Sequence, residues 1–399
     1  MPDLEALNAV AAASIEAVNG VAKASVEAVN GVSVVSGQTA TRWVAAFDGS
    51  GSNWYISYAA HSDRTSWTGT TVQSTTPHAY WLAYGKDGSG NAIWAAACDS
   101  NSMHVAHDAN NDVTDGSTWT KVDFDNNKVR RIAWGNDVWI AIGHRNNGNE
   151  LYRSTDGASW AEIDLSGLAN INTTTIFSLA SDGAGNWMFG QGNRIYASVN
   201  DGSAWAQMDS YEAGSGGTVC DIGFTNNTWV VLDAGTPGQI NTVGAAAFAT
   251  EMGGGTDATW GAQECEDGDG DTINTGTSGG TRTTMACGNG VAVIAHPTNT
   301  MAFDVNGTTI GVRASGKVAV GNNDARDSGR VAGNIQNIAT DGNGVWLLCT
   351  DGVDGTSGDG GDIAQSTDNG ATWTRIVEDY TFNGEREIRA IRANVYLPV

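Results

Sequence analysis

The sequence predicts an all-β protein whose main part is a seven-bladed β-propeller of four-stranded antiparallel blades. Three observations lead to this prediction. Short apolar or alternating segments bounded by Gly, Asn, Asp and Ser recur along the chain, as antiparallel strands and their turns do. Tryptophan, present 15 times, returns at two positions of a unit of roughly 40–60 residues, the size of a propeller blade. The 53 glycines suit many tight turns and leave little room for helical bundles.

The clearest copy of the unit lies at residues 129–164. We expect its four strands at 131–134, 138–142, 151–154 and 159–163, because each segment is short, apolar or alternating, and flanked by turn residues. A Gly-Asn turn separates the first two strands, and a Thr-Asp-Gly turn separates the last two. The unit is therefore expected to form one antiparallel blade.

The number of blades follows from the positions of the tryptophans. The expected second strands carry Trp54, Trp94, Trp139, Trp187, Trp229 and Trp346, with Val291 at that position in one further copy. The expected fourth strands carry Trp67, Trp119, Trp160, Trp205, Trp260 and Trp373. These positions define seven units, and seven blades form a natural closed ring.

The two ends of the propeller segment suggest how the ring closes. The first unit is short, and the last segment, 386–399, repeats the pattern of a first and second strand once more. A late strand that completes an incomplete first blade explains both features. An eighth blade is the alternative.

A second, shorter repeat occupies the N-terminus. Residues 1–35 contain segments that align every 11 residues and place Asn8, Asn19 and Asn30 in register. Asn-Gly follows at two of these positions, and this dipeptide is a poor helix interior and a strong type I′ turn signal, so we expect short β segments punctuated by turns. So short an arm cannot bury a core alone and must dock on a partner or on copies of itself. We therefore divide the chain into an arm at 1–35, a linker at 36–40 and a propeller at 41–399.

Several turns before the expected fourth strands share a motif of the form S-x-D-x-G-x-T-W. It is complete at Ser366, Asp368, Gly370 and Trp373, and one residue shorter at Ser154, Asp156, Gly157 and Trp160. A third copy, Ser198, Asp201, Gly202 and Trp205, has Asn200 at the Asp position. This motif resembles the Asp-box, or BNR repeat, of sialidase-like propellers. In that family the boxes lie at the blade periphery, which implies a structural role for these residues.

The N-terminal units resemble a different group of proteins. Tandem x-[IV]-x-x-[VI]-N-G-V segments of this kind are similar to the N-terminal segments of structural proteins of tailed bacteriophages. The resemblance implies attachment to a virion through residues 1–35. Release of virions by lysis would explain an exterior type of composition without a recognisable secretory signal at the N-terminus, so we expect a virion-surface or extracellular location.

Charge and hydropathy exclude several classes of partner. Asp and Glu number 44 against 20 Lys and Arg, which gives a formal charge of −24. Nucleic acid and anionic membrane surfaces attract positive potential, so neither is an expected partner. No apolar stretch approaches 18 residues, so membrane insertion is not expected. The five cysteines show no C-x-x-C spacing, and three lie inside apolar runs, as buried small hydrophobic residues do.

Candidate binding residues fall in the variable loops between second and third strands, because loops on a rigid scaffold commonly carry specificity. These candidates are His144, Arg145, Asn146, Asn193 and Asp233. Three alternating carboxylates, Asp267, Asp269 and Asp271, resemble the opening of a calcium loop, but Thr272 and Ser278 replace the Gly and Glu of an EF-hand. A solvated acidic loop is the favoured interpretation, and no cofactor is expected.

The resemblance to sialidases raises the question of catalysis. Sialidases carry an arginine cluster, a Tyr–Glu pair and an acid Asp, with the first arginine in an R-I-P stretch. The nearest string here is Arg131-Ile132-Ala133, and the 15 arginines are scattered along the sequence.

We therefore expect a non-enzymatic structural or adhesion protein of a tailed phage, as tail fibre, spike or capsid decoration. It would contact other virion proteins, or further copies of itself, through residues 1–35 and a host glycan or partner protein through the propeller. A sialidase-like glycoside hydrolase and an intracellular assembly-factor propeller are the alternatives.

Overall fold

The computed structural model separates the chain into two compact units, Met1–Thr39 and Ala40–Val399. In the first unit it describes residues 17–18, 21–22, 28–29 and 32–33. In the second it describes 40–396 except for 48–52, 74–78, 99–101, 108–111, 125–127, 146–147, 172–175, 212, 214–216, 236–237, 267–282, 297–298, 317–319, 322–330, 333–334, 352–359 and 382–386. The two units are described separately below.

The first unit contains two short antiparallel ladders. β1 (Ala17–Val18) pairs with β2 (Val21–Ala22), and β3 (Ala28–Val29) pairs with β4 (Val32–Ser33). Each pair encloses two residues, and the sequence at those positions is Asn-Gly in both. Two-residue Asn-Gly connections favour hairpins, because both residues tolerate the positive φ that a type I′ turn requires.

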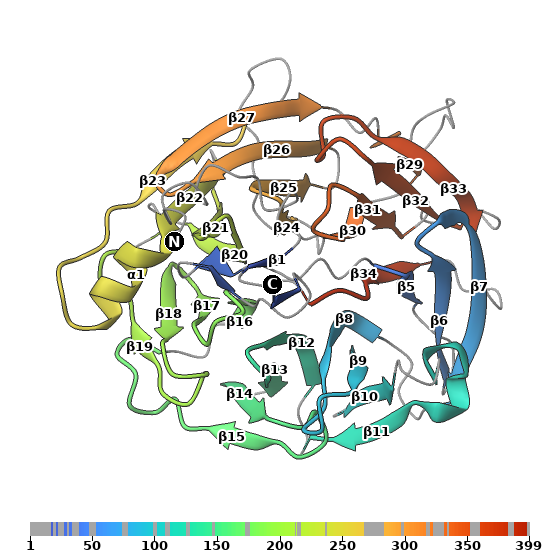
Figure 1. Cartoon of the computed structure of the whole chain (residues 1–399), viewed down its shortest axis with the longest axis horizontal. Coiled ribbons are helices and arrows are strands. Elements are labelled where there is room, and N and C mark those ends of the chain that lie inside the picture. The colour runs from blue at the N-terminus through green and yellow to red at the C-terminus, as the bar shows by residue number, and fades with distance from the viewer. Residues whose placement is uncertain are drawn as a thin grey trace. The chain divides into compact units, whose positions relative to one another are not determined.

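The second unit is a ring of seven four-stranded antiparallel blades (Figure 1). Blade 1 combines β34 (Ile388–Ala393) with β5 (Arg42–Phe47), β6 (Asn53–Ala60) and β7 (Asp63–Gln73). Blades 2 and 3 contain β8 (Ala79–Lys86), β9 (Ala92–Cys98), β10 (Ser102–His107), β11 (Thr120–Asp123), and β12 (Lys128–Gly135), β13 (Val138–Arg145), β14 (Gly148–Ser154), β15 (Ala161–Ile163). Blades 4 and 5 contain β16 (Ile176–Ser181), β17 (Trp187–Gln191), β18 (Arg194–Ser198), β19 (Ala206–Gln207), and β20 (Thr218–Thr225), β21 (Thr228–Ala234), β22 (Gln239–Gly244), β23 (Gly261–Glu264). Blades 6 and 7 contain β24 (Thr284–Gly288), β25 (Val291–His296), β26 (Asn299–Asn306), β27 (Thr309–Gly316), and β30 (Ile335–Thr340), β31 (Trp346–Thr350), β32 (Gly361–Ser366), β33 (Thr374–Tyr380).

Seven blades of four antiparallel strands confirm the predicted fold class and decide against the eighth blade. The first strand of each blade lies nearest the centre of the ring and the fourth lies at the rim (Figure 1). Two residues each of β28 (Val320–Gly321) and β29 (Val331–Ala332) form a separate parallel pair.

Helical elements are few in the described part of the chain. Two 3-10 turns, η4 (Asp112–Thr114) and η5 (Gly116–Thr118), precede β11, and α1 (Ala245–Met252) joins β22 to β23. The buried Phe248 of α1 packs against Trp229, with ring centroids 5.2 Å apart. None of these helices is long and apolar enough to cross a membrane.

The core consists of side chains packed between neighbouring blades. One Trp on the second strand of six blades has no exposed surface, namely Trp43, Trp94, Trp139, Trp187, Trp229 and Trp346. The prediction placed Trp54 on the second strand of blade 1, but Trp54 lies on β6, the third strand, and Trp43 takes the second-strand position on β5. In blade 6 the pairing of Cys287 with Ala292 matches that of Trp134 with Trp139, so Ala292, rather than the predicted Val291, occupies the Trp position.

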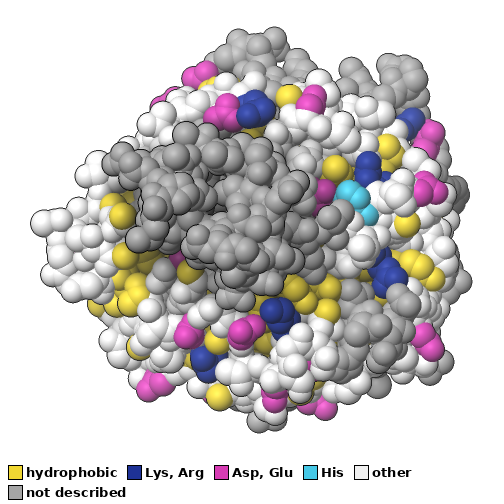
Figure 2. Space-filling model, in the orientation of Figure 1, with side chains coloured by type: hydrophobic (Ala, Val, Ile, Leu, Met, Phe, Trp, Pro, Cys, Tyr) yellow, Lys and Arg dark blue, Asp and Glu magenta, His cyan; other side chains and the backbone are white. Residues whose placement is uncertain are grey.

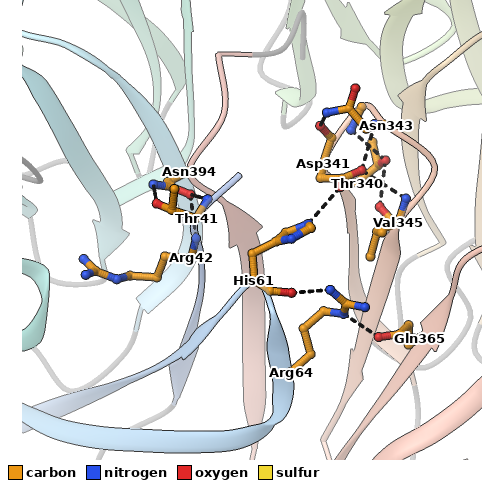
Figure 3. Close-up of polar contacts among 11 residues, drawn as sticks. Thr41, Arg42, His61, Arg64, Thr340, Asp341, Asn343, Val345, Gln365 and Asn394 are labelled. Carbon is orange, nitrogen blue, oxygen red and sulfur yellow. Dashed lines mark hydrogen bonds and ion pairs between the residues drawn. The ribbon is translucent and has the colours of Figure 1, made fainter. Parts of the chain in front are cut away.

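The ring closes through blade 1, where the C-terminal β34 pairs with the N-terminal β5. Asn394 fastens this junction (Figure 3): its Oδ1 accepts from the backbone N of Thr41 at 2.9 Å and of Arg42 at 2.8 Å, and its Nδ2 donates to Thr41 Oγ1 at 2.9 Å. On the adjoining side of blade 1, His61 Nε2 lies 2.9 Å from Asp341 Oδ2 of blade 7 (Figure 3). Both sets of contacts join residues from opposite ends of the propeller sequence.

Candidate functional site

Six of the seven innermost strands carry a β-bulge at the same place, near the start of the strand. The register shifts lie between Ala79 and Trp81, Val129 and Arg131, Ile176 and Ser178, Val219 and Asp221, Ile335 and Asn337, and Ile388 and Ala390. A bulge sets two residues of one strand against one residue of its partner and so redirects their side chains. The bulge therefore gives each of these six strands two adjacent positions of this kind, and those of blades 1, 2, 3, 5 and 7 supply side chains to the central opening.

These positions form a central pocket of about 250 Å³. It is lined by residues from six blades: Tyr80, Trp81, Arg130, Arg131, Cys220, Asp221, Thr283, Thr284, Gln336, Asn337 and Arg389. The pocket opens where the first strands begin and the second strands end, since Lys128 at the start of β12 pairs with His144 near the end of β13. It therefore lies on the face that carries the connections between second and third strands.

Three guanidinium groups give this pocket its chemical character. Arg131 is buried and forms an ion pair with the buried Asp221, with Nη2 and Oδ1 2.5 Å apart. The other Asp221 oxygen accepts from the backbone N of Met285 at 2.9 Å and lies 3.3 Å from Thr284 Oγ1. Asp221 thus fixes Arg131 and joins blade 3 to blades 5 and 6.

Aromatic and polar neighbours hold all three arginines of the pocket in place. The Arg130 guanidinium lies 4.4 Å from the ring centroid of Tyr80, and that of Arg131 lies 4.0 Å from Trp81, both within the range of cation–π contacts. Arg389 donates to Gln336 Oε1 at 3.2 Å and forms an ion pair with Glu387, the residue before β34. The guanidiniums are therefore set in place by their neighbours, as an anion-binding site requires.

The charge of the pocket lining differs in sign from the net charge of the chain. Figure 2 shows basic side chains interspersed with acidic ones over the described surface. Against a formal charge of −24 for the chain, the pocket lining contains three arginines and one carboxylate, Asp221, among the described residues. Asp221 compensates Arg131 and Glu387 pairs with Arg389, so the three arginines leave an excess of positive charge at the pocket, which favours an anionic ligand.

The structure places the predicted binding-loop residues in different settings. Asn193 lies in the turn between β17 and β18, on the same face as the pocket. The backbones of His144 and Arg145 end β13, while their side chains and Asn146 lie outside the described residues. Asp233 is not in a loop: it lies in β21, is 5% exposed, and accepts hydrogen bonds from Tyr211 Oη and, at 2.9 Å, from Asn241 Nδ2.

The environment of Asp233 leads to a prediction about pH. Burial raises the pKa of this carboxyl from its ordinary 3.8 to about 6, although its two hydrogen bonds act in the opposite direction. A pKa raised by folding means that Asp233 contributes stability below about pH 4, and that this contribution is lost as the pH rises through 6. Between those values we expect a loss on the order of 3 kcal/mol.

Chemical unfolding as a function of pH, at constant ionic strength, measures this effect. In the Asp233→Asn variant the free energy of unfolding should fall less steeply between pH 4 and pH 6, and the difference in slope should correspond to about one proton. A variant with the same slope as the native protein in that range would refute the assignment to Asp233.

The predicted calcium residues Asp267, Asp269 and Asp271 lie outside the described residues. Within the part of the chain that the structure describes, no group of three or more His, Cys, Asp or Glu residues is arranged to hold a metal ion.

The Ser-x-Asp turns lie at the opposite end of the blades from the pocket, between third and fourth strands. In blade 3, Ser154 Oγ accepts from the Gly157 backbone N at 2.9 Å, and Asp156 Oδ1 accepts from Ala158 N at 2.8 Å and Ser159 N at 2.7 Å. Trp160 Nε1 donates to the Gly157 carbonyl at 3.1 Å. The motif thus satisfies its own backbone, which is a structural function.

The copies of this turn differ in one informative respect. Ser366, Asp368, Gly370 and Trp373 repeat the blade 3 pattern in blade 7. In blade 4 Asn200 takes the place of the Asp, and Ser198, Gly202 and Trp205 make the equivalent bonds. Asp201 instead accepts from Asn136 Nδ2 of blade 3 at 2.7 Å, so it links neighbouring blades.

Glycine is required in these turns for two reasons. Gly157 has a φ of +72°, and a Cβ there would lie 2.6 Å from Ile93 Cδ1 of blade 2. Gly202 and Gly370 also have positive φ and equally close contacts with Ile140 and Val293 of the preceding blades. These three turns therefore pack blades 3, 4 and 7 against blades 2, 3 and 6.

Comparison with known proteins supports the fold alone. No protein-family description matches the sequence, and no curated protein matches it. Among solved structures, a putative 6-phosphogluconolactonase from Bacteroides uniformis shares 10% identity at a TM-score of 0.52, covering 89% of this chain and 100% of that one. The WD40 propeller domain of Doa1 shares 11% identity at 0.42, covering 83% and 87%. Chaetomium thermophilum Raptor shares 10% at 0.44; 75% of this chain is covered, and it spans a quarter of the Raptor chain. The fold and site together define a seven-bladed β-propeller with a central arginine-lined pocket.

Proposed function

We propose that this chain is a non-enzymatic structural and adhesion protein of a tailed-phage particle, and that its propeller binds an acidic sugar of the host surface in the central pocket. One observation carries the binding proposal. Arg130 and Arg131 of blade 3 and Arg389 of blade 1, which is more than 250 residues away in the sequence, converge on a single pocket of an otherwise acidic protein. Guanidinium groups match the planar geometry of carboxylates and bind them with two parallel hydrogen bonds.

Size and shape favour a single sugar ring over a larger ligand. A pocket of about 250 Å³ falls just below the roughly 300–1,000 Å³ typical of drug-sized ligands. The aromatic rings of Tyr80 and Trp81 provide apolar surface beside the arginines, while Gln336 and Thr283 provide hydrogen-bonding groups for hydroxyls. A carboxylated monosaccharide unit combines these requirements in one ligand.

The state of Asp221 supports binding without hydrolysis. Glycosidases use two carboxyl groups roughly 5–9 Å apart, one of which remains available as acid or base. Among the described lining residues Asp221 is the carboxylate of the pocket, and its oxygens are engaged by Arg131 and the Met285 backbone. This arrangement suits the fixing of an arginine better than proton transfer.

Two features support the virion setting. Residues 1–39 form a compact unit separate from the propeller, and their Asn-Gly repeats resemble those of phage structural proteins. The hydrogen bonds of the Ser-x-Asp turns agree with the resemblance to Asp-box propellers, in which such turns stabilise the blades. We infer that residues 1–35 contact other virion proteins while the propeller is displayed to the outside.

Calorimetric titration of the full chain with matched acidic and neutral oligosaccharides tests the binding proposal. We expect binding of the acidic members only, weakened roughly 10–100-fold in Arg130→Met and Arg389→Met. Arg313→Met is the control, because Arg313 is paired with Asp304 on β26 and lies outside the pocket. Equal binding of neutral and acidic sugars would refute the proposal, and release of free sugar would favour the glycoside hydrolase instead.

A further inference from the structure

A seven-fold pattern in the innermost strands has a single exception. The residue paired with the position after the recurring second-strand Trp, which is Ala292 in blade 6, is small in six blades: Ala83, Ala133, Ala180, Gly223, Ala286 and Ala339. In blade 1 the equivalent residue, paired with Val44, is Arg392. One long cationic side chain therefore extends from a position at which the other blades carry almost no side chain.

Arg392 is buried and lacks a partner within the described structure. Its exposed fraction is 9%, and its Nε and Nη2 atoms have no hydrogen-bond acceptor among the described residues. Guanidinium is effectively never deprotonated in proteins, so the side chain brings a full positive charge into the interior. Burial, together with the charge of Arg131, lowers the pKa of Arg392 to about 10, which still leaves it protonated at neutral pH.

A small cavity lies at this side chain, beneath the central pocket. Its volume is about 20 Å³, and its lining includes Arg392, Gly223 and Ala286. Trp81 and Arg131 line both this cavity and the larger pocket above it. A space of this size holds about one water-sized sphere and excludes a sugar or a phosphate.

The local charge requires an anion. The charge of Arg131 is compensated by Asp221, whereas Arg392 forms no ion pair in the described part of the chain. An unpaired buried charge is strongly unfavourable, and a bound counter-ion removes most of that cost. We propose that this cavity binds one halide-sized monovalent anion, chloride in solution, on the Arg392 guanidinium.

This site has a structural role that is independent of any sugar in the pocket above. Arg392 lies on β34, the strand that closes the ring, and the other cavity residues belong to blades 2, 3, 5, 6 and 7. An anion held there attracts both Arg392 and Arg131 and so opposes the separation of blade 1 from blade 3. Chloride is therefore expected to stabilise the closed propeller.

Thermal unfolding of the full chain, with chloride exchanged for gluconate at constant ionic strength, tests the proposal. We expect the melting temperature to rise by roughly 2–4 °C over about a hundredfold range of chloride above the dissociation constant. Arg392→Met should abolish this dependence. Arg313→Met, an exposed arginine, and Arg389→Met, in the pocket above, should retain it. The behaviour of Arg389→Met separates this site from the sugar-binding proposal.

Bromide provides a second measurement that needs no variant. Crystals of the native protein grown in bromide should show an anomalous peak beside the Arg392 guanidinium. Its absence would mean that the cavity holds water alone and would overturn the proposal. A chloride dependence that persists in Arg392→Met, or that gluconate reproduces, would overturn it as well.

Discussion

Removal of residues 387–399 is expected to abolish the cooperative folding of the propeller. These residues include β34, the innermost strand of blade 1, and Tyr396, which stacks on Tyr84 with centroids 5.0 Å apart and contacts Trp134 at the same distance. Without β34 the inner edge of β5 loses its ladder partner, and buried residues such as Ile388 and Ile391 leave gaps against blade 7. We expect loss of the native near-ultraviolet circular dichroism signal and exposure of apolar surface to dyes.

A graded version of this test uses Asn394→Ala. The substitution leaves the backbone N–H groups of Thr41 and Arg42 without their acceptor, and it also removes the bond to Thr41 Oγ1. Each of these three partly buried hydrogen bonds contributes about 0.5–1.5 kcal/mol, so a loss of roughly 2–4 kcal/mol is expected in chemical unfolding. Glu264→Ala, at an exposed position on β23, serves as the control and should change stability by less than about 0.5 kcal/mol. An unchanged unfolding midpoint for Asn394→Ala would show that this junction does not hold the ring closed.

Deletion of residues 1–36 should leave the propeller intact and abolish its incorporation into virions. Ala40–Val399 forms its own compact unit, and the closing contacts begin at Thr41, so the deletion removes none of the bonds that fasten blade 1. We expect a melting temperature within about 1 °C of that of the full chain, since surface changes away from the core seldom shift stability further.

Mass spectrometry of purified particles measures the second part of this prediction. The full chain should co-purify with the particles, and the shortened chain should remain in the soluble fraction. If the shortened chain unfolds or aggregates, the N-terminal unit is integral to the propeller. If the full chain is found only as a free protein, the virion proposal fails, whereas the pocket and its ligand are unaffected.

The fold was predictable from the sequence because its signals are local. Trp139 lies on the second strand of blade 3, and Trp160 directly precedes its fourth strand rather than lying on it as predicted. Equivalent residues repeat in most other blades, so the number of units can be counted without long-range information. Closure by a late strand was also indicated by residues 386–399. The role of Trp54 was misassigned because its segment is an apolar strand like its neighbours, and only the pairing of β34 with β5 shows that the first unit begins with a second strand.

The central pocket was not predictable in the same way. Arg130 and Arg389 belong to different blades, and their proximity depends on ring closure. A weak signal exists in the inner strands, where two residues separate apolar ones, as in Val129-Arg130-Arg131-Ile132 and Ile335-Gln336-Asn337-Ile338. A regular strand would place these two residues on opposite faces, and it is the bulge that brings both toward the centre.

The helix α1 was missed for a different reason. Its eight residues, AAAFATEM, follow Gly244 without a side-chain cap, and the segment is too short to show helical periodicity. Its stability comes from tertiary packing of Phe248 against Trp229, which the sequence alone does not show.

A crystal structure of the full chain with the most tightly bound acidic oligosaccharide is the most direct test of the proposed binding function. We predict that the sugar carboxylate lies between the guanidiniums of Arg130 and Arg389, with the ring in the central pocket. A ligand bound at the outer strands or among the Ser-x-Asp turns, with the central pocket empty, would contradict this function.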